Sequence, residues 1–451
     1  MKRFIETLKN IWKIEELKSK ILLTLGLLLI YRVGSNVVLP GIDPESLEAL
    51  RSQTNSGLLG ILNAFTGGAF ANASILALGI MPYISASIVM QLLGMAVPSI
   101  QKMQKEGESG RRKVNQITRV LTIAITTAQA PGYIANLISQ NVAITLPSGL
   151  FWPLAIVVLT TGTIFAMWLG ERITDKGIGN GISLLIMVGI IATLPQSFLQ
   201  ELASKMGPQG GGLVLFIVEI AALLIVIMLS IGLVQAVRRI PVQYARRTQG
   251  GVQYGASSRQ YIPLKVNAAG VMPIIFAQAI MFIPVTVLSY SGADGGGASS
   301  LITLFSNIQG FWYNFIFALM IILFTFLYTA IQVNTNQMAD DLKRGGGFIP
   351  GIKPGKDTAE FLDTVLSRIT FPGSIFLAII AIIPAFAMAA GVNTQFSYFY
   401  GGTSLLIMVG VVLDTLQQIE SYLVNRHYDG LMKSGRIQSR TASAVDQTNA
   451  V

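Results

Sequence analysis

Ten long apolar segments constrain the fold of this chain more than any other feature of its sequence. A helix needs about twenty mostly apolar residues to cross the roughly 30 Å hydrocarbon layer of a bilayer. Segments of this kind occupy residues 21–40, 74–97, 117–139, 150–170, 181–199, 213–237, 267–290, 310–333, 373–391 and 402–422. Only 12% of the residues are charged, against roughly a quarter in soluble domains. We therefore predict an all-α polytopic membrane protein with ten transmembrane helices.

The residue types that are missing exclude several kinds of chemistry. The chain has no cysteine, and its single histidine, His427, lies in a polar C-terminal tail. Disulfides, thiolate metal sites and most histidine-dependent catalysis are thereby excluded. The sequence also contains no GxxxxGK[ST] phosphate loop and no Ser/His or paired-Asp constellation. We expect no catalytic residues, no metal and no cofactor, and hence a protein that is not an enzyme.

The positions of Lys and Arg predict the orientation in the membrane. Of the 32 basic residues, 28 lie in the N-terminal arm, the tail and alternate loops, the set that should face the cytoplasm. Both termini are therefore predicted to be cytoplasmic. Residues 1–20 are expected to form an amphipathic segment on the bilayer surface, and residues 423–451 a cytoplasmic tail.

Two of the basic loops, 237–266 and 334–372, are longer than a connection between helices requires. Long polar loops in a membrane protein often dock a partner, although a flexible connector is an alternative.

An internal repeat divides the chain into two halves. Residues 79–84 resemble residues 270–275, and residues 183–189 are identical to 404–410 at all seven positions. The matches pair the second span with the seventh and the fifth with the tenth. Two units of five spans, within 21–200 and 201–422, must insert with opposite orientation because five is odd. Inverted repeats place a functional site between the halves, and here the repeated side chains are aliphatic.

The acidic residues within the predicted spans bear on an alternative function. A carrier of ions or small polar solutes would place ionisable groups at the site between the halves. The candidates are Glu219 and Asp414, and each could equally be a structural partner of another group. An ion-coupled secondary transporter, a class that is also built from inverted repeats, is therefore one function to be weighed.

A short apolar stretch over residues 57–71 precedes the second span. A helix of fourteen or so residues reaches only about 21 Å, which is too short to span the bilayer. It is predicted to be a re-entrant segment that closes a cavity, with a surface helix as the alternative.

Five motifs in order along the chain resemble the SecY family, relatives of the eukaryotic Sec sixty-one alpha subunit. They occupy residues 77–87, 105–112, 177–183, 263–267 and 400–404, so the resemblance extends over essentially the whole chain. It implies the pore-forming subunit of a protein-conducting channel, which passes unfolded secretory polypeptides across the membrane and releases transmembrane segments into lipid. Such a channel is passive and is driven by a partner ATPase or by the ribosome.

The resemblance also implies roles for individual residues. A pore ring maps to Ile80, Ile84, Ile186, Ile275 and Ile407. A mobile plug maps to Leu58, Leu59, Ile61, Leu62, Phe65, Gly67 and Gly68. A polar cluster at a lateral gate maps to Ser85, Gln91, Gln129 and Asn267, which could instead be ordinary interhelical hydrogen-bonding groups. Docking of the ribosome or motor maps to Arg246, Arg247, Lys343, Arg344 and Lys353.

The docking residues depart from the family pattern at two places. The family often has a basic pair where this chain reads Gly251-Val252-Gln253, and Lys353 stands where an Arg is usual. Lysine keeps the charge but lacks the bidentate fork of arginine. The implied partners are SecE-like and SecG-like small membrane subunits, a SecA motor, the ribosome, signal sequences, unfolded preproteins and membrane lipid. The implied location is the bacterial inner membrane.

Overall fold

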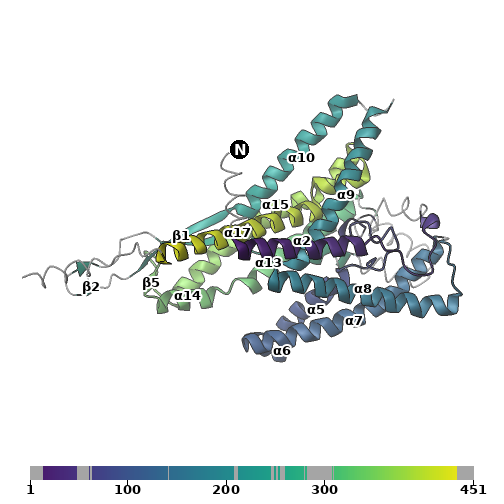
Figure 1. The fold of residues 1–451 in the computed structure, drawn as a ribbon. Coiled ribbons are helices and arrows are strands. Elements are labelled where there is room, and N and C mark those ends of the chain that lie inside the picture. Colours follow the sequence, from purple (N-terminus) through teal and green to yellow (C-terminus); the bar gives the residue numbers. More distant parts are fainter. Residues whose placement is uncertain are drawn as a thin grey trace, which may run out of the picture.

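The computed structural model describes most of the chain and is mainly helical. The described residues are 14–47, 60, 63–140, 142–207, 212–244, 248–249, 252–253, 260–278, 280–281, 307 and 309–433. The helices are α2 (Glu15–Gly34), η1 (Pro44–Ser46), α5 (Met81–Ala96), α6 (Pro98–Lys105), α7 (Glu108–Ser139), α8 (Ser148–Lys176), α9 (Gly181–Met206), α10 (Gly212–Gln235), α13 (Phe311–Gln332), α14 (Thr335–Arg344), α15 (Lys356–Ala389), α16 (Thr394–Ser397), η2 (Tyr398–Tyr400) and α17 (Gly402–Lys433). They form an elongated bundle (Figure 1).

Within this described part, six helices are long and apolar enough to cross a membrane. They are α8, α9, α10, α13 with its continuation into α14, α15 and α17. A seventh span results if α5 and α6, which meet at a bend of 106°, count as one. The first and third predicted spans fall on α2 and α7, whereas the seventh, 267–290, lies only partly within the described residues. The chain is thus a multi-pass helical membrane protein.

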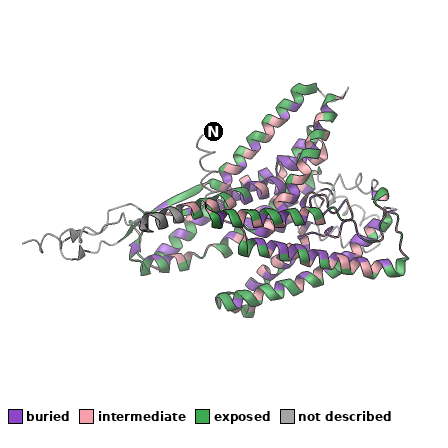
Figure 2. Ribbon diagram, viewed as in Figure 1, coloured by how far each residue is buried: buried purple, intermediate pink, exposed green. Residues whose placement is uncertain are grey.

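The outer surface of the bundle is apolar, as a lipid-facing surface must be. On α10 the most exposed large side chains include Val214, Val218 and Met228, each more than 60% exposed. Only 22% of the most apolar 18-residue stretch of α10 is buried, and Figure 2 shows exposed residues along the whole helix. A soluble protein would cover such a face with charged residues.

Several helices extend beyond their predicted spans, as α15 does by beginning at Lys356 and not at 373, and two other boundaries differ for a reason that the structure shows. The second span was expected to begin at residue 74, but residues 66–80 form turns and α5 begins only at Met81. Ala73 and Gly79 have positive φ, which no helix can include, and Pro82 occupies the first turn, where its missing N–H needs no partner. The fifth span was expected to end at 199, but α9 continues to Met206 because its polar residues find buried partners.

Close packing between α8 and the neighbouring segments depends on glycine. A Cβ at Gly162 would overlap the carbonyl oxygen of Ile75, and one at Gly181 would overlap that of Gly170. These contacts press the 66–80 turns and the start of α9 against α8. They set the positions of two elements that carry candidate site residues.

The two long loops form one small sheet at an end of the bundle. Strand β1 (Val237–Tyr244) pairs antiparallel with β4 (Gln260–Lys265) and with β5 (Gly347–Phe348), in the order β4-β1-β5. A separate pair joins β2 (Thr248–Gln249) to β3 (Val252–Gln253). The sheet has an apolar core of Ile240, Val242, Leu264, Leu342, Ile349 and Leu362. Figure 1 places β1, β5 and α14 at the end opposite the junction of α9 and α10.

Candidate functional site

The five isoleucines of the predicted ring belong to one hydrophobic cluster. Ile80, Ile186 and Ile407 are buried in it, with 4%, 6% and 3% of their surface exposed. Ile84 and Ile275 are partly buried and pack against the same cluster. We call these five side chains the isoleucine cluster. They come from the end of the 66–80 turns, α5, α9, the helical residues 272–278 and α17, so both repeated halves contribute.

The backbone explains how two of these side chains reach the cluster. Gly79 and Gly270 occupy equivalent places in the repeat and adopt φ of 54° and 63°. This left-handed conformation is strained for other residues, so glycine is needed to end the preceding turns and start each helix. Ile80 and Ile84 follow the first glycine, and Ile275 follows the second. The repeat seen in the sequence is thus also a repeat of backbone conformation.

A polar cavity of about 370 Å³ borders this cluster. Its lining residues are mainly polar or glycine and come from α2 and the turn after it, residues 60–72, α9 and the segment before α17. They include Arg32, Asn36, Asn63, Thr193, Gln196 and Gln395. Phe399 lines the cavity and also belongs to the buried cluster, so the two regions are adjacent.

The predicted plug is described only in its second part. Phe65 is buried in the same hydrophobic cluster as Ile80, and Gly67 and Gly68 both have positive φ, at 65° and 89°. The remaining predicted plug residues, Leu58, Leu59, Ile61 and Leu62, lie outside the described residues.

The four predicted gate residues, all described, are not joined by hydrogen bonds. Ser85 donates to the carbonyl of Met81 in its own helix, and Gln129 is exposed. The side-chain oxygens of Gln91 and Asn267 are buried without a hydrogen-bond partner. An unpartnered buried oxygen is unfavourable, and these four side chains do not form a hydrogen-bonded cluster with one another within the described part of the chain.

The predicted docking residues that the structure describes are exposed on the side of the small sheet. Lys343 and Arg344 end α14, where the helix dipole favours cations, and Lys353 lies in the turn before α15. Arg246 and Arg247 lie outside the described residues.

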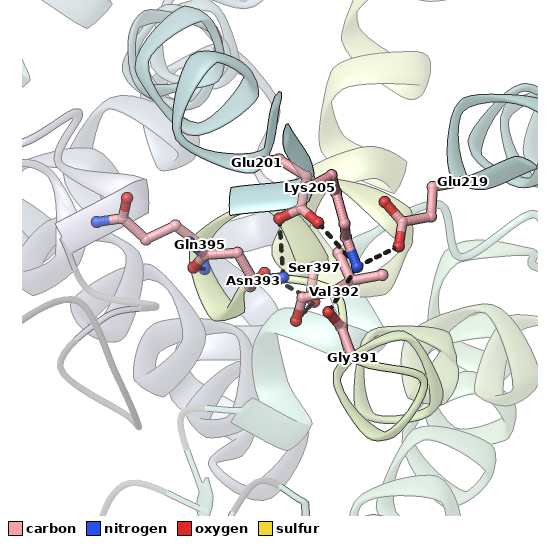
Figure 3. A network of polar contacts seen from close by, with 8 residues as sticks. All are labelled: Glu201, Lys205, Glu219, Gly391, Val392, Asn393, Gln395 and Ser397. Carbon is pink, nitrogen blue, oxygen red and sulfur yellow. Dashed lines mark hydrogen bonds and ion pairs between the residues drawn. The ribbon is translucent and has the colours of Figure 1, made fainter. Parts of the chain in front are cut away.

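A buried ion triad of Glu201, Lys205 and Glu219 was missed by the sequence analysis. Lys205 Nζ lies 2.8 Å from a Glu219 oxygen and 3.5 Å from a Glu201 oxygen, and it donates to the carbonyl of Gly391 at 2.9 Å. The other Glu201 oxygen accepts from the backbone N–H of Asn393 at 2.9 Å. Figure 3 shows these groups converging from α9, α10 and the turn after α15.

This triad also accounts for one of the two acids considered for ion coupling. Glu219 is paired with Lys205 near the start of α10, and Asp414 is exposed on α17. Neither lines the polar cavity. The i to i+4 spacing of Glu201 and Lys205 was the signal that could have placed both on a continuing helix.

Comparison with known proteins identifies the family. A protein-family model described as SecY matches residues 74–416. The chain belongs to the SecY family. Among the SecY relatives, a protein translocase subunit SecY of Streptomyces scabiei is 43% identical over 434 residues, covering 94% of this chain and 98% of the relative. The protein translocase subunit SecY of Bacillus licheniformis is 44% identical over 437 residues, covering 95% and 99%.

The SecY fold is also found in solved structures. One, described as the structure of a protein conducting channel, has a TM-score of 0.62 at 20% identity and covers 89% of this chain and 91% of that one. An idle yeast Ssh1 complex bound to the yeast 80S ribosome has a TM-score of 0.60 at 14% identity and covers 88% and 89%. A further match concerns a SecY plug domain that stabilises the closed channel, with a TM-score of 0.61 at 19% identity over 89% and 91%.

Proposed function

We propose that this SecY-family chain is the pore-forming subunit of a protein-conducting channel, through which unfolded polypeptides cross the membrane or enter it. The observation that carries the proposal is that five isoleucines from both repeated halves belong to, or pack against, one hydrophobic cluster beside a polar cavity. Flexible aliphatic side chains exclude ions from a closed constriction by keeping it dry. They also part around any peptide, because they form no specific hydrogen bonds with it.

The wider architecture of the proposal has ten spans in two inverted halves, 21–200 and 201–422, with a plug at 57–71. The positive φ that Gly79 and Gly270 share supports the division of the chain into two related halves. Burial of Phe65 in the same hydrophobic cluster as Ile80 supports a plug that seats under the isoleucine cluster. The plug domain of a SecY protein of the same fold is described as stabilising the closed state of its channel.

The lateral gate of the proposal lies at the seam between α5 and the helical residues 272–278. The position of the gate is supported by two buried side-chain oxygens, on Gln91 and Asn267, that have no hydrogen-bond partner. A polar group of an entering segment could donate a hydrogen bond to either oxygen. A seam that these side chains do not bridge by hydrogen bonds to one another should separate at small energetic cost, so an entering signal helix could replace its contacts and reach the lipid.

Docking in the proposal uses the small sheet, which joins both long loops into one platform with its own apolar core. The platform faces the cytoplasm of a bacterium, as both termini do, and receives a SecA-type ATPase or a ribosome. SecE-like and SecG-like subunits complete the complex in the inner membrane. A ribosome is the partner named for a protein of the same fold.

The function is tested by reconstituting the chain with SecE-like and SecG-like subunits in lipid vesicles. After addition of a SecA-type motor, ATP and an unfolded preprotein, we expect the preprotein to become protected from external protease. The control is the same vesicle without ATP. Saturable uptake of a small solute driven by a counter-ion, with no protected preprotein, would instead establish the secondary transporter.

Charge reversal on the platform should weaken docking. We expect the combined Lys343→Glu, Arg344→Glu and Lys353→Glu substitutions to lower ribosome or motor affinity by about tenfold, because cationic surfaces attract nucleic-acid phosphates and acidic proteins. Co-sedimentation of ribosomes or motor with the vesicles measures the effect. The matched control is Lys356→Glu, an exposed cation close by. Equal loss in the control would show a general charge effect and no docking site.

A further inference from the structure

Arg32 places a positive charge within the first predicted span. Its side chain is half-buried and faces the polar cavity. Among the described residues it forms no ion pair, and its Nη1 donates a hydrogen bond to the carbonyl oxygen of Gly67 at 2.8 Å. An ionisable group at membrane depth is unfavourable unless a cavity hydrates it, and it usually has a function. The bond to Gly67 indicates which segment Arg32 acts on.

Gly67 is enclosed between this guanidinium and helix α9. A Cβ at Gly67 would lie 2.7 Å from Arg32 Nη1 and 2.7 Å from the Cα of Gly189. A Cβ at Gly189 would in turn lie 2.8 Å from the carbonyl oxygen of Phe65. The backbone of residues 65–67 therefore lies directly against α9, at a point where the helix has no side chain.

Comparison with the second copy of the repeat indicates that Gly189 is a glycine because the backbone of residues 65–67 lies against it. Gly410 is the counterpart of Gly189, since each ends its copy of the seven-residue repeat. Among the described residues, a Cβ at Gly410 would meet Val271 Cγ2 alone, at 3.4 Å, which is an ordinary contact. One repeat glycine accommodates a neighbouring backbone closely and the other does not.

The segment that rests on Gly189 is held together by hydrogen bonds of its own. Gly68 donates to the carbonyl of Asn63 at 2.9 Å, and the Asn63 side chain accepts from the N–H of Ala71 at 3.0 Å. At its far end, the Tyr133 hydroxyl donates to the carbonyl of Phe70 at 2.8 Å. These bonds let residues 63–68 move as a unit, and the contacts that hold the unit in place include Arg32, Gly189 and the buried side chain of Phe65.

We propose that Arg32 and Gly189 form a seat that holds residues 63–68 against the isoleucine cluster in the closed channel. Arg32 supplies one directional hydrogen bond, and Gly189 supplies the space for close backbone contact. Loss of the single hydrogen bond costs little, because water can replace it in a polar cavity. An arriving polypeptide can therefore displace the segment from its seat. The inference rests on the proposed channel function and assigns two positioning residues within it.

The test uses a Thr66→Cys reporter in this cysteine-free chain, assembled as the complete translocase in vesicles. Thr66 is buried, so a membrane-impermeant thiol reagent should label it slowly while the segment is seated. We expect Arg32→Met and Gly189→Ala each to raise the labelling rate severalfold and to increase ion leak in the absence of substrate. Arg32→Lys should restore slow labelling in part, because lysine can also donate to the Gly67 carbonyl.

Two matched controls and a second reporter make the outcomes distinct. Gln196→Ala alters another polar group of the same cavity, and Gly410→Ala alters the repeat counterpart of Gly189; both should leave Thr66→Cys labelling unchanged. An Ile134→Cys reporter, fully buried in α7, must stay protected throughout.

Unchanged labelling in both Arg32→Met and Gly189→Ala would overturn the seat, as would labelling that rises equally at the Thr66 and Ile134 positions. The proposed channel would survive either result if preprotein is still transported. If the unsubstituted chain transports no preprotein, the proposed channel function itself is refuted.

Discussion

Replacing Lys205 with Met is expected to lower the free energy of unfolding by about 3–5 kcal/mol, the usual effect of removing one partner from a buried ion pair. Glu201 is fully buried and Glu219 is only 8% exposed. Without the ammonium group, both carboxylates lose their counter-charge, and the carbonyl of Gly391 loses its donor. The thermal or denaturant unfolding midpoint of the purified protein in detergent measures the effect.

Two further variants separate a buried-charge effect from a general loss of packing. The triple variant Glu201→Gln, Lys205→Met, Glu219→Leu removes all charges together and should recover most of the lost stability. Arg112→Met breaks an ion pair of 2.7 Å whose side chains are 76% and 83% exposed, and it should leave the midpoint unchanged. A triple variant as unstable as the single one would contradict the interpretation of the triad.

Serine at Ile186 and Ile407 together is expected to raise the ion permeability of the resting channel by at least about tenfold, because hydroxyl groups hydrate a constriction that aliphatic groups keep dry. Both side chains are buried in the isoleucine cluster and lie at equivalent places in the repeat. Conductance across planar bilayers, or efflux of ions from vesicles, measures the permeability without added substrate.

The same two helices provide the control for this substitution. Ile191 in α9 and Val412 in α17 are 41% and 39% exposed on the surface of the bundle. Serine at these two positions should leave the permeability close to that of the unsubstituted channel. Equal leak from the buried and the exposed pairs would show that the cluster is not the barrier to ions.

The parts of this structure that could be predicted from sequence are those imposed by the membrane and by the repeat. Apolar length predicted the helices α8, α9, α10, α13, α15 and α17, because a bilayer requires about twenty apolar residues for each span. The repeat and the family resemblance together selected five isoleucines from distant segments, and the structure gathers all five in one cluster.

Other features depend on contacts between residues far apart in the sequence. Hydropathy could not show that residues 74–80 are turns, because it carries no information on the backbone conformation, such as the positive φ of Gly79. Glu201 and Lys205 looked like part of an exposed loop, because their partners Glu219 and Asn393 come from other helices and turns. The pairing of β1 with β5 likewise joins two loops that are separated by α13.

The central claim is that the isoleucine cluster surrounds a polypeptide in transit, and site-specific crosslinking tests it most directly. Single cysteines at Ile84, Ile275 and Ile407 are introduced in turn, and a secretory polypeptide carrying a thiol-reactive probe is stalled in the channel in membranes. A cysteine at the exposed Ile191 serves as the control. We predict adducts from the three cluster positions and none from the control. If the polypeptide is crosslinked at the cytoplasmic loops but forms no adducts at the cluster, the claim that it passes through the isoleucine cluster is contradicted.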